Sequence, residues 1–192
     1  FEMINETTEE AFNLLENLLR WTRNQNGKTK IYATLFNLTP VARQVVSLFS
    51  AIANAKEIEL INRIEGKFDI FADEDMIKTV LRNLISNAIK FTYTGGQVEL
   101  SLADSGDCWT IYVKDNGKGI PKDLQTHLLK SDEYITTYGT HNEKGSGLGL
   151  ILCRDFIRMN KGKLHFCSQE GIGTTFYFTI PKASSSAKAA SR

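Results

Sequence analysis

Cysteine, proline and long apolar runs are scarce in this sequence, and the scarcity of cysteine and of apolar runs excludes whole classes of protein. Three cysteines among 192 residues, Cys108, Cys153 and Cys167, form neither a disulfide framework nor a paired set of metal ligands, so isolated reduced thiols are expected. No apolar run approaches membrane-spanning length, and no signal-peptide pattern is present. Lys and Arg number 23 against 22 Asp and Glu, so no basic surface for nucleic acid is indicated. We therefore expect a cytoplasmic protein that does not bind nucleic acid.

Residues 1–26 show a heptad-like pattern. Apolar and small residues recur at steps of three and four, at Phe1, Ile4, Thr8, Ala11, Leu15, Leu18 and Thr22. This pattern predicts a coiled-coil-like helix that packs on another helix or another subunit, the alternative being an ordinary helix on the chain's own core. Residues 27–35 follow as a linker. Because the chain begins with Phe inside a helical pattern, we expect it to be a fragment of a longer protein.

Residues 36–181 have the size of one compact domain, and 42% of the whole chain is hydrophobic. The expected helices span residues 39–56, 73–92, 121–130 and 147–160, and the expected strands span residues 58–64, 68–72, 98–102, 109–113, 163–168 and 174–180. Thr39 and Asp73 are the expected helix caps. The predicted fold class is α+β, a two-layer α/β sandwich with a mixed, mostly antiparallel sheet. Residues 182–192 are small and polar and are expected to be a disordered tail or a linker.

The stretch Leu81–Thr92 reads as a helix with two different faces. Asn83, Asn87 and Lys90 recur at helical spacing beside an apolar stripe, so they project from one side. A carboxamide oxygen can ligate a hard cation such as magnesium, and a lysine can neutralise phosphate oxygens. A polar helix face is ordinarily just solvated, so the glycine clusters downstream decide between the two interpretations.

Three glycine clusters follow this helix in the sequence. The first, DNGKGI at residues 115–120, comes directly after a predicted strand; its carboxylate could accept a hydrogen bond from an exocyclic amine, and the alternative is a simple β-turn. The second, GSGLGL at residues 145–150, opens a helix and could bind phosphate there. A Rossmann interpretation is disfavoured, because the polar segment 131–144, typical of a mobile lid, precedes it instead of a long apolar strand. The third cluster, GIGT at residues 171–174, is by itself a tight hairpin.

In this order, the asparagine–lysine helix and the three clusters resemble the nucleotide-binding boxes of sensor histidine kinases. That family belongs to the superfamily shared with gyrase, MutL and the large heat-shock chaperones. The resemblance covers residues 36–181 and implies a Bergerat-type ATP-binding fold, while residues 1–26 look like the end of a dimerisation and histidine-phosphotransfer helix.

The resemblance also implies roles for individual residues. Asn87 would ligate the magnesium that bridges the ATP phosphates, and Asp115 would recognise the adenine amine. Further residues would line the phosphate side, the adenine floor and the junction of lid and helix, namely Asn83, Lys90, Tyr93, Gly117, Gly119, Ile120, Lys144, Gly145, Ser146, Gly147, Leu148, Gly149 and Thr174. A solvated lid cation is an equally good interpretation of Lys144.

Position 83 separates a kinase from an ATPase. Hydrolytic relatives carry a glutamate four residues before the magnesium-binding asparagine, where it can activate water; Asn83 occupies that place here, and an amide is no general base. The resemblance therefore implies a protein histidine kinase that transfers the γ-phosphoryl group of Mg-ATP to a histidine, for relay to a response-regulator aspartate. His127, His141 and His165 all lack the sequence context of the acceptor, so we expect the acceptor outside this fragment. The alternatives are a nucleotide-binding module without phosphotransfer, or a serine/threonine kinase or ATPase on the same fold.

The same resemblance implies partners for the full-length protein. These are ATP, the dimerisation and phosphotransfer domain of the same protein, and a receiver domain or response regulator. The full-length protein is expected to be a homodimer anchored in the inner membrane, with this domain in the cytoplasm.

Overall fold

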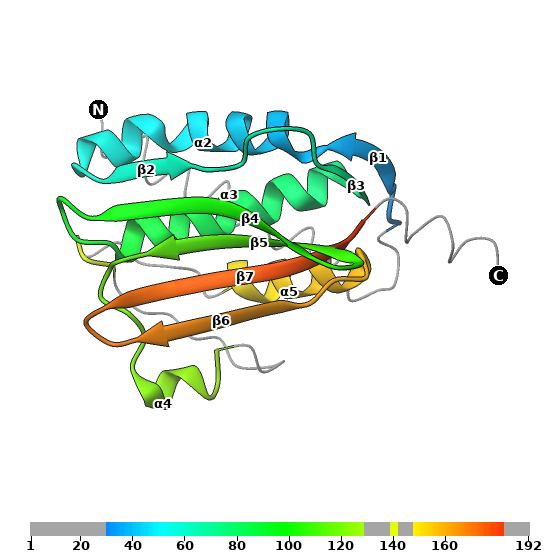
Figure 1. Ribbon diagram of the computed structural model, residues 1–192. Helices are drawn as coiled ribbons and strands as arrows, with labels where there is room; N and C mark the ends of the chain where they lie inside the picture. Colours follow the sequence, from blue (N-terminus) through cyan, green and yellow to red (C-terminus); the bar gives the residue numbers. More distant parts are fainter. Residues whose placement is uncertain (1–29, 129–138, 142–147, 183–192) are drawn as a thin grey trace.

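A computed structural model describes residues 30–128, 139–141 and 148–182. A five-stranded sheet with the strand order β2-β4-β5-β7-β6 is its centre (Figure 1). Its strands are β2 (Glu59–Asn62), β4 (Gln97–Ser105), β5 (Cys108–Asp115), β6 (Leu164–Gln169) and β7 (Gly173–Pro181). Strands β2 and β4 are parallel and the other neighbours are antiparallel, which confirms the predicted mixed, mostly antiparallel sheet.

Helices form a second layer beside this sheet. They are α2 (Leu38–Ala55), α3 (Glu74–Phe91) and α5 (Gly149–Met159), and Figure 1 shows α3 and α5 behind the strands. The inward side chains of α3, α5 and the central strands form one buried core, in which Leu81, Leu84, Ile111, Phe156 and Phe178 are almost completely inaccessible. The predicted two-layer sandwich is therefore confirmed. None of the helices described is both long and apolar enough to cross a membrane.

A second, two-stranded sheet was not predicted. Strand β1 (Thr34–Asn37) pairs antiparallel with β3 (Asp69–Ala72), so part of the segment expected to be a linker is a strand. Strands β2 and β3, which are neighbours in sequence, belong to different sheets. The predicted N-terminal helix 1–26 and the tail beyond residue 182 lie outside the described residues.

The first helix of the domain has a different cap from the one predicted. Asn37 caps α2, and its side-chain oxygen accepts a hydrogen bond from the backbone N–H of Thr39 at 3.1 Å. The hydroxyl of Thr39 instead donates to the carbonyl of Gly66 at 2.7 Å. The prediction of Thr39 as the cap is therefore wrong, because a distant carbonyl engages the hydroxyl. Asp73 caps α3 as predicted, accepting from the N–H of Met76 at 3.1 Å.

Two other helices are shorter than predicted. Helix α4 spans only Lys122–Gln125, and the side chain of Gln125 bonds back to the carbonyls of Ile120 and Ser168, while residues 129 and 130 lie outside the described residues. His127, expected in that helix, lies in the turn after it. Helix α5 begins at Gly149 and ends at Met159 with Asn160 as its C-cap; Gly147 lies outside the described residues.

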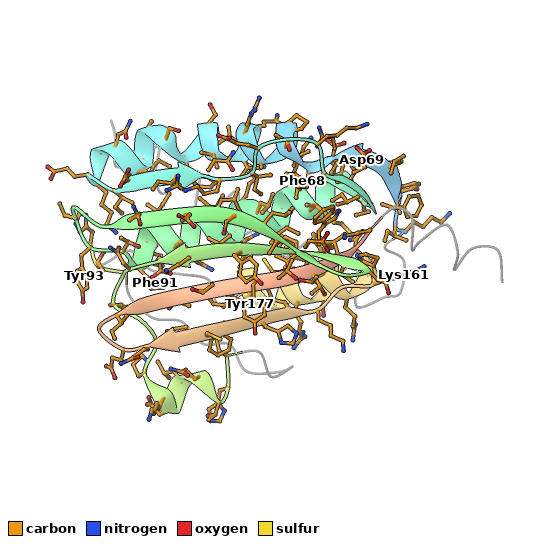
Figure 2. The ribbon with its side chains drawn as sticks, viewed as in Figure 1. Phe68, Asp69, Phe91, Tyr93, Lys161 and Tyr177 are labelled. Carbon is orange, nitrogen blue, oxygen red and sulfur yellow. The ribbon has the colours of Figure 1, made fainter. Side chains whose placement is uncertain are left out.

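The opposite face of the large sheet carries an aromatic ladder. Tyr177, labelled in Figure 2, stacks on Tyr112 with ring centroids 5.6 Å apart and on His165 at 5.4 Å, and it is the direct cross-strand neighbour of both. Such cross-strand aromatic pairs stabilise a sheet where apolar cover is limited. In the described part of the chain, no helix covers this face (Figure 1).

Candidate functional site

The two faces of α3 differ in burial as the sequence predicts. Ile77, Leu81 and Leu84 are inaccessible, whereas Asn83 and Asn87 are half-buried on another side. Lys90 is half-buried as well, in the last turn of the helix. A helical repeat of 3.6 residues places the three polar positions along one stripe. This stripe is the first component of the candidate site.

Asn83 meets the beginning of α5. Its Nδ2 donates to the carbonyl of Thr79 at 2.9 Å, which fixes the orientation of the amide. A Cβ added at Gly149, the first residue of α5, would lie only 2.7 Å from Oδ1 of Asn83. A residue without a side chain therefore allows the N-terminal end of α5 to approach the polar stripe. Leu148 and Gly149 are half-buried at this junction.

Asp115 ends β5 and is buried, with 7% of its surface exposed. Its Oδ1 accepts hydrogen bonds from the backbone N–H of Gly117 at 3.0 Å and of Thr174 at 3.1 Å. Burial raises the pKa of the carboxyl from 3.8 to about 6, and these two hydrogen bonds oppose the rise. Within the described part of the chain both bonds end on Oδ1, which leaves Oδ2 available to accept a donor from a ligand.

Gly117 and Gly173 let backbone segments approach one another beside Asp115. A Cβ at Gly117 would lie 2.1 Å from the carbonyl oxygen of Phe91, and one at Gly173 would lie 2.1 Å from the carbonyl oxygen of Asp115. Gly173 also has a φ of +139°, which side chains other than hydrogen disfavour. Both glycines thus lie close to other backbone segments of the protein itself. This close packing brings together the end of α3, the end of β5 and the start of β7.

Gly119 and Ile120 continue this loop toward β6. The N–H of Ile120 donates to the hydroxyl of Ser168 at 2.9 Å, and that hydroxyl also lies 2.9 Å from the hydroxyl of Thr174. Gly119 is buried with a positive φ of 67°, and Ile120 is half-buried. Ser168, which the sequence analysis did not single out, thus links the loop to Thr174.

Phe91 follows Lys90 at the end of the polar stripe, and the sequence analysis did not single it out. The Nζ atoms of Lys90 and Lys118 lie 5.3 and 5.0 Å from the centroid of its ring. Such distances suit cation–π contacts. Tyr93, the aromatic residue that was expected to face phosphates, lies beyond the helix and is 56% exposed; Figure 2 shows both at the same end of the molecule. The one feature of the sequence that could have pointed to Phe91 as a site residue is its position directly after Lys90.

The structure brings a subset of the expected residues into direct contact. Asn83 and Gly149 meet directly, as do Asp115, Gly117 and Thr174. Lys144, Gly145, Ser146 and Gly147 lie outside the described residues. Among the residues described, no three His, Cys, Asp or Glu side chains form a group that could hold a metal ion. A hard cation could instead use the carboxamide oxygen of Asn87, because amide oxygens are suitable ligands.

The chain resembles histidine kinases in sequence and in structure. Residues 72–184 match the family described as Histidine kinase-, DNA gyrase B-, and HSP90-like ATPase. The Adaptive-response sensory kinase SasA of Crocosphaera subtropica is 30% identical over 170 residues, which are 88% of this chain and 44% of the relative. The chain spans less than half the length of the curated relatives it matches.

Solved structures show the same similarity. The catalytic domain of histidine kinase ThkA, in its nucleotide-free form, has a TM-score of 0.67 and 31% identity, over 78% of this chain and 97% of that chain. ThkA in complex with the response regulator protein TrrA has a TM-score of 0.71 and 26% identity, over 96% of this chain and 52% of that chain. Full-length ShkA in complex with AMPPNP has a TM-score of 0.78 and 25% identity, over 95% of this chain and 38% of that chain.

Proposed function

This chain belongs to the family of histidine kinase-, DNA gyrase B- and HSP90-like ATPases, and we propose that it is the catalytic ATP-binding domain of a sensor histidine kinase. In this proposal it transfers the γ-phosphoryl group of Mg-ATP to a histidine of a dimerisation and phosphotransfer domain, for relay to an aspartate of a receiver domain. The observation that carries the proposal is the buried carboxylate of Asp115, held at the end of β5 by Gly117 and Thr174, where the following loop meets the end of α3 at Phe91.

Asp115 defines the adenine end of the site. Its backbone hydrogen bonds fix Oδ1, so that Oδ2 can accept a bond from the exocyclic amine of adenine. Thr174 and Gly117 support the carboxylate from two sides, and Gly119 and Ile120 continue the floor beside it. The complex of the relative ShkA with AMPPNP supports an adenine nucleotide as the ligand.

The stripe on α3 and the beginning of α5 define the phosphate end. Free N–H groups at a helix N-terminus attract phosphate, and Gly149 at the start of α5 lies against Asn83. Lys90 supplies positive charge in the last turn of α3. Asn87 would hold magnesium through its carboxamide oxygen; when bound, the ion would neutralise charge on the phosphates and orient them. Lys144, Gly145, Ser146 and Gly147 would extend this end, and Tyr93 would border it.

Asn83 favours transfer to a protein over hydrolysis. A carboxamide cannot take a proton from water near neutral pH, and the Nδ2 group of Asn83 is already committed to the carbonyl of Thr79. Phosphoryl transfer depends mainly on positioning and charge, which this arrangement provides. The complex of the relative ThkA with the response regulator TrrA supports a response regulator as the downstream partner.

Isothermal calorimetry with Mg-ATP tests the proposal. Wild-type chain should bind one equivalent, and Asp115→Ala and Asn87→Ala should each weaken binding at least about tenfold, because each removes a polar contact to the nucleotide or to the ion. Asp75→Asn, in the exposed first turn of the same helix, is the matched control and should bind as wild type does. Binding that survives both alanine substitutions would contradict the proposed site.

A further inference from the structure

The C-terminal end of α3 receives hydrogen bonds from several separate segments. An α-helix leaves its last four carbonyl groups without partners inside the helix. Here each of the last four carbonyls has a donor: Ala88 from the hydroxyl of Thr92 at 2.7 Å, Ile89 and Lys90 from Nζ of Lys56 at 3.0 Å each, and Phe91 from the N–H of Lys118 at 3.0 Å. The helix end that carries Lys90 is therefore held by Thr92 beside it and by Lys56 and Lys118, which are distant in sequence.

Lys56 is an unusual donor because it is buried. It follows α2 as the C-cap residue, with only 7% of its surface exposed, and its side chain reaches across to α3. Lysine is rarely buried to this extent without partners for its charge. The carbonyls at a helix C-terminus carry partial negative charge, so they are suitable partners for an ammonium group. Lys56 thus offsets negative charge at the same end of α3 that presents Lys90.

Thr140 binds the same carbonyl from another direction. Its N–H and its Oγ1 each lie 3.1 Å from the carbonyl oxygen of Lys90, and its Oγ1 lies 2.8 Å from that of Thr92. His141 adds a contact of 3.3 Å between its Nε2 and the hydroxyl of Thr94. Residues 139–141 are therefore fastened to the end of α3, and the carbonyl of Lys90 is shared by Lys56 and Thr140.

We propose that Lys56 and Thr140 are positioning residues for the phosphate end of the nucleotide site. This inference rests on the proposed function. By fixing the carbonyl of Lys90 they fix the backbone from which the side chain of Lys90 extends. Lys56 also reduces the negative potential that the helix end would otherwise direct at bound phosphates. The bonds of Lys56 and Thr140 given above hold the end of α3, whereas Asp115 accepts its bonds from Gly117 and Thr174.

Comparing the affinities for Mg-ATP and for adenosine distinguishes this positioning role from a general effect on stability. Mg-ATP engages both ends of the site, whereas adenosine engages only the adenine end. Lys56→Met keeps the aliphatic stem and removes the ammonium, and Thr140→Val keeps the shape and removes the hydroxyl. Each variant should weaken Mg-ATP about 3- to 10-fold, because Lys90 would be held less firmly, and should leave adenosine affinity within about twofold. Thr140→Ser retains the hydroxyl and should bind Mg-ATP as wild type does.

Controls keep the result interpretable. Calorimetry gives Mg-ATP affinity and NMR titration gives adenosine affinity. Thr126→Val, which removes an exposed hydroxyl after α4, should change neither. Asp115→Ala should weaken both ligands, and its failure to do so would contradict the proposed function. If Asp115→Ala weakens both while Thr140→Val binds Mg-ATP normally, only the present inference fails. Equal loss of both ligands in Thr140→Val would also overturn it, and this variant decides the matter even if Lys56→Met does not fold.

Discussion

The side-chain oxygen of Asn160 accepts a hydrogen bond from the backbone N–H of Asp73 at 2.7 Å, and both residues are buried. Asn160 ends α5, while Asp73 caps the start of α3. The Nδ2 group of Asn160 also donates to the carbonyl of Phe156 at 2.8 Å. One buried amide thus joins the start of α3 to the end of α5, while the start of α5 at Gly149 meets the middle of α3 at Asn83.

Asn160→Ala should destabilise the domain. The substitution leaves the N–H of Asp73 buried without a partner and removes the bond to the carbonyl of Phe156, so we expect a loss of about 2–3 kcal/mol in the free energy of unfolding. Urea denaturation followed by circular dichroism measures it. Lys163→Ala, at an exposed position nearby, is the control and should change stability by less than about 0.5 kcal/mol. Similar midpoints for both variants would refute a structural role of the amide.

The raised pKa of Asp115 predicts how stability depends on pH. The folded protein holds the proton of this carboxyl up to a pH of about 6, whereas its ordinary pKa is 3.8. The folded state therefore binds the proton more tightly than the unfolded chain does. The contribution of this group to stability is complete below pH about 4 and is lost as the pH rises to about 6. Above that range the folded protein contains an ionised, buried carboxylate.

Asp115→Asn should consequently stabilise the nucleotide-free protein at pH 7.5. The asparagine oxygen can still accept from Gly117 and Thr174, and the charge is gone; we expect a gain of about 1–3 kcal/mol. Urea unfolding at pH 7.5 and pH 4.5 measures it, and the difference from wild type should largely disappear at the lower pH. The same variant should lose affinity for Mg-ATP, because an amide N–H₂ faces the amine. A variant less stable than wild type at pH 7.5 would contradict the assignment of a buried charge.

The affinity of the wild-type protein for Mg-ATP should depend on pH through the ionisation of Asp115. The adenine amine donates to the ionised carboxylate, so Mg-ATP affinity should fall as the pH decreases below about 6. Calorimetry between pH 5 and pH 8 tests this. An affinity that is constant across this range would show that Asp115 is not the residue that titrates in the nucleotide complex.

Two glycines in one turn should respond differently to alanine. Gly171 has a φ of +75° and open space around it, so Gly171→Ala should cost only the strain of a left-handed conformation, about 1–2 kcal/mol. At Gly173 a Cβ would also lie 2.1 Å from the carbonyl of Asp115, so Gly173→Ala must displace backbone at the site. We expect it to cost at least twice as much and to weaken Mg-ATP binding. Thermal melts of the two variants, only two positions apart, provide the comparison; equal melting temperatures would argue against the close approach.

The elements that the sequence predicted correctly have local signals. Both hairpins follow from alternating residues on either side of a glycine turn, and the cap of α3 follows from an aspartate before an apolar run. Strand β1 was missed because it has only four residues and pairs with β3, which is distant in sequence. The sequence predicts Thr39 as the cap of α2, but Asn37 holds that place in the structure, because the hydroxyl of Thr39 donates to the carbonyl of Gly66.

At the candidate site, too, some residues can be predicted from local sequence and others only from the fold. Asn83, Asn87, Asp115 and the glycines stand in motifs that can be read in order along the chain. The roles of Lys56 and Asn160 cannot be predicted from motifs, because each side chain bonds to backbone groups that only the folded chain brings near it. Phe91 lies within a motif that was read, but its contacts with two lysines depend on how the loop at residues 115–120 returns to the end of α3. Motifs therefore predict the groups that face a ligand, and tertiary structure is needed for those that hold them.

From the positions of its three histidines, we predict that this chain binds Mg-ATP but does not phosphorylate itself. His165 stacks on Tyr177 on the sheet face that no described helix covers, and His127 lies in the turn after α4. His141 lies within 3.3 Å of the hydroxyl of Thr94. Phosphoryl transfer requires the acceptor nitrogen in line with the γ-phosphate, and we expect none of these three histidines to reach that geometry. Incubation with Mg-ATP labelled at the γ-phosphate should leave no acid-labile label on the chain. His141→Asn is the informative variant, because His141 is nearest to the end of α3. Stoichiometric acid-labile labelling of wild type that disappears in His141→Asn would identify an acceptor within this chain and contradict the prediction.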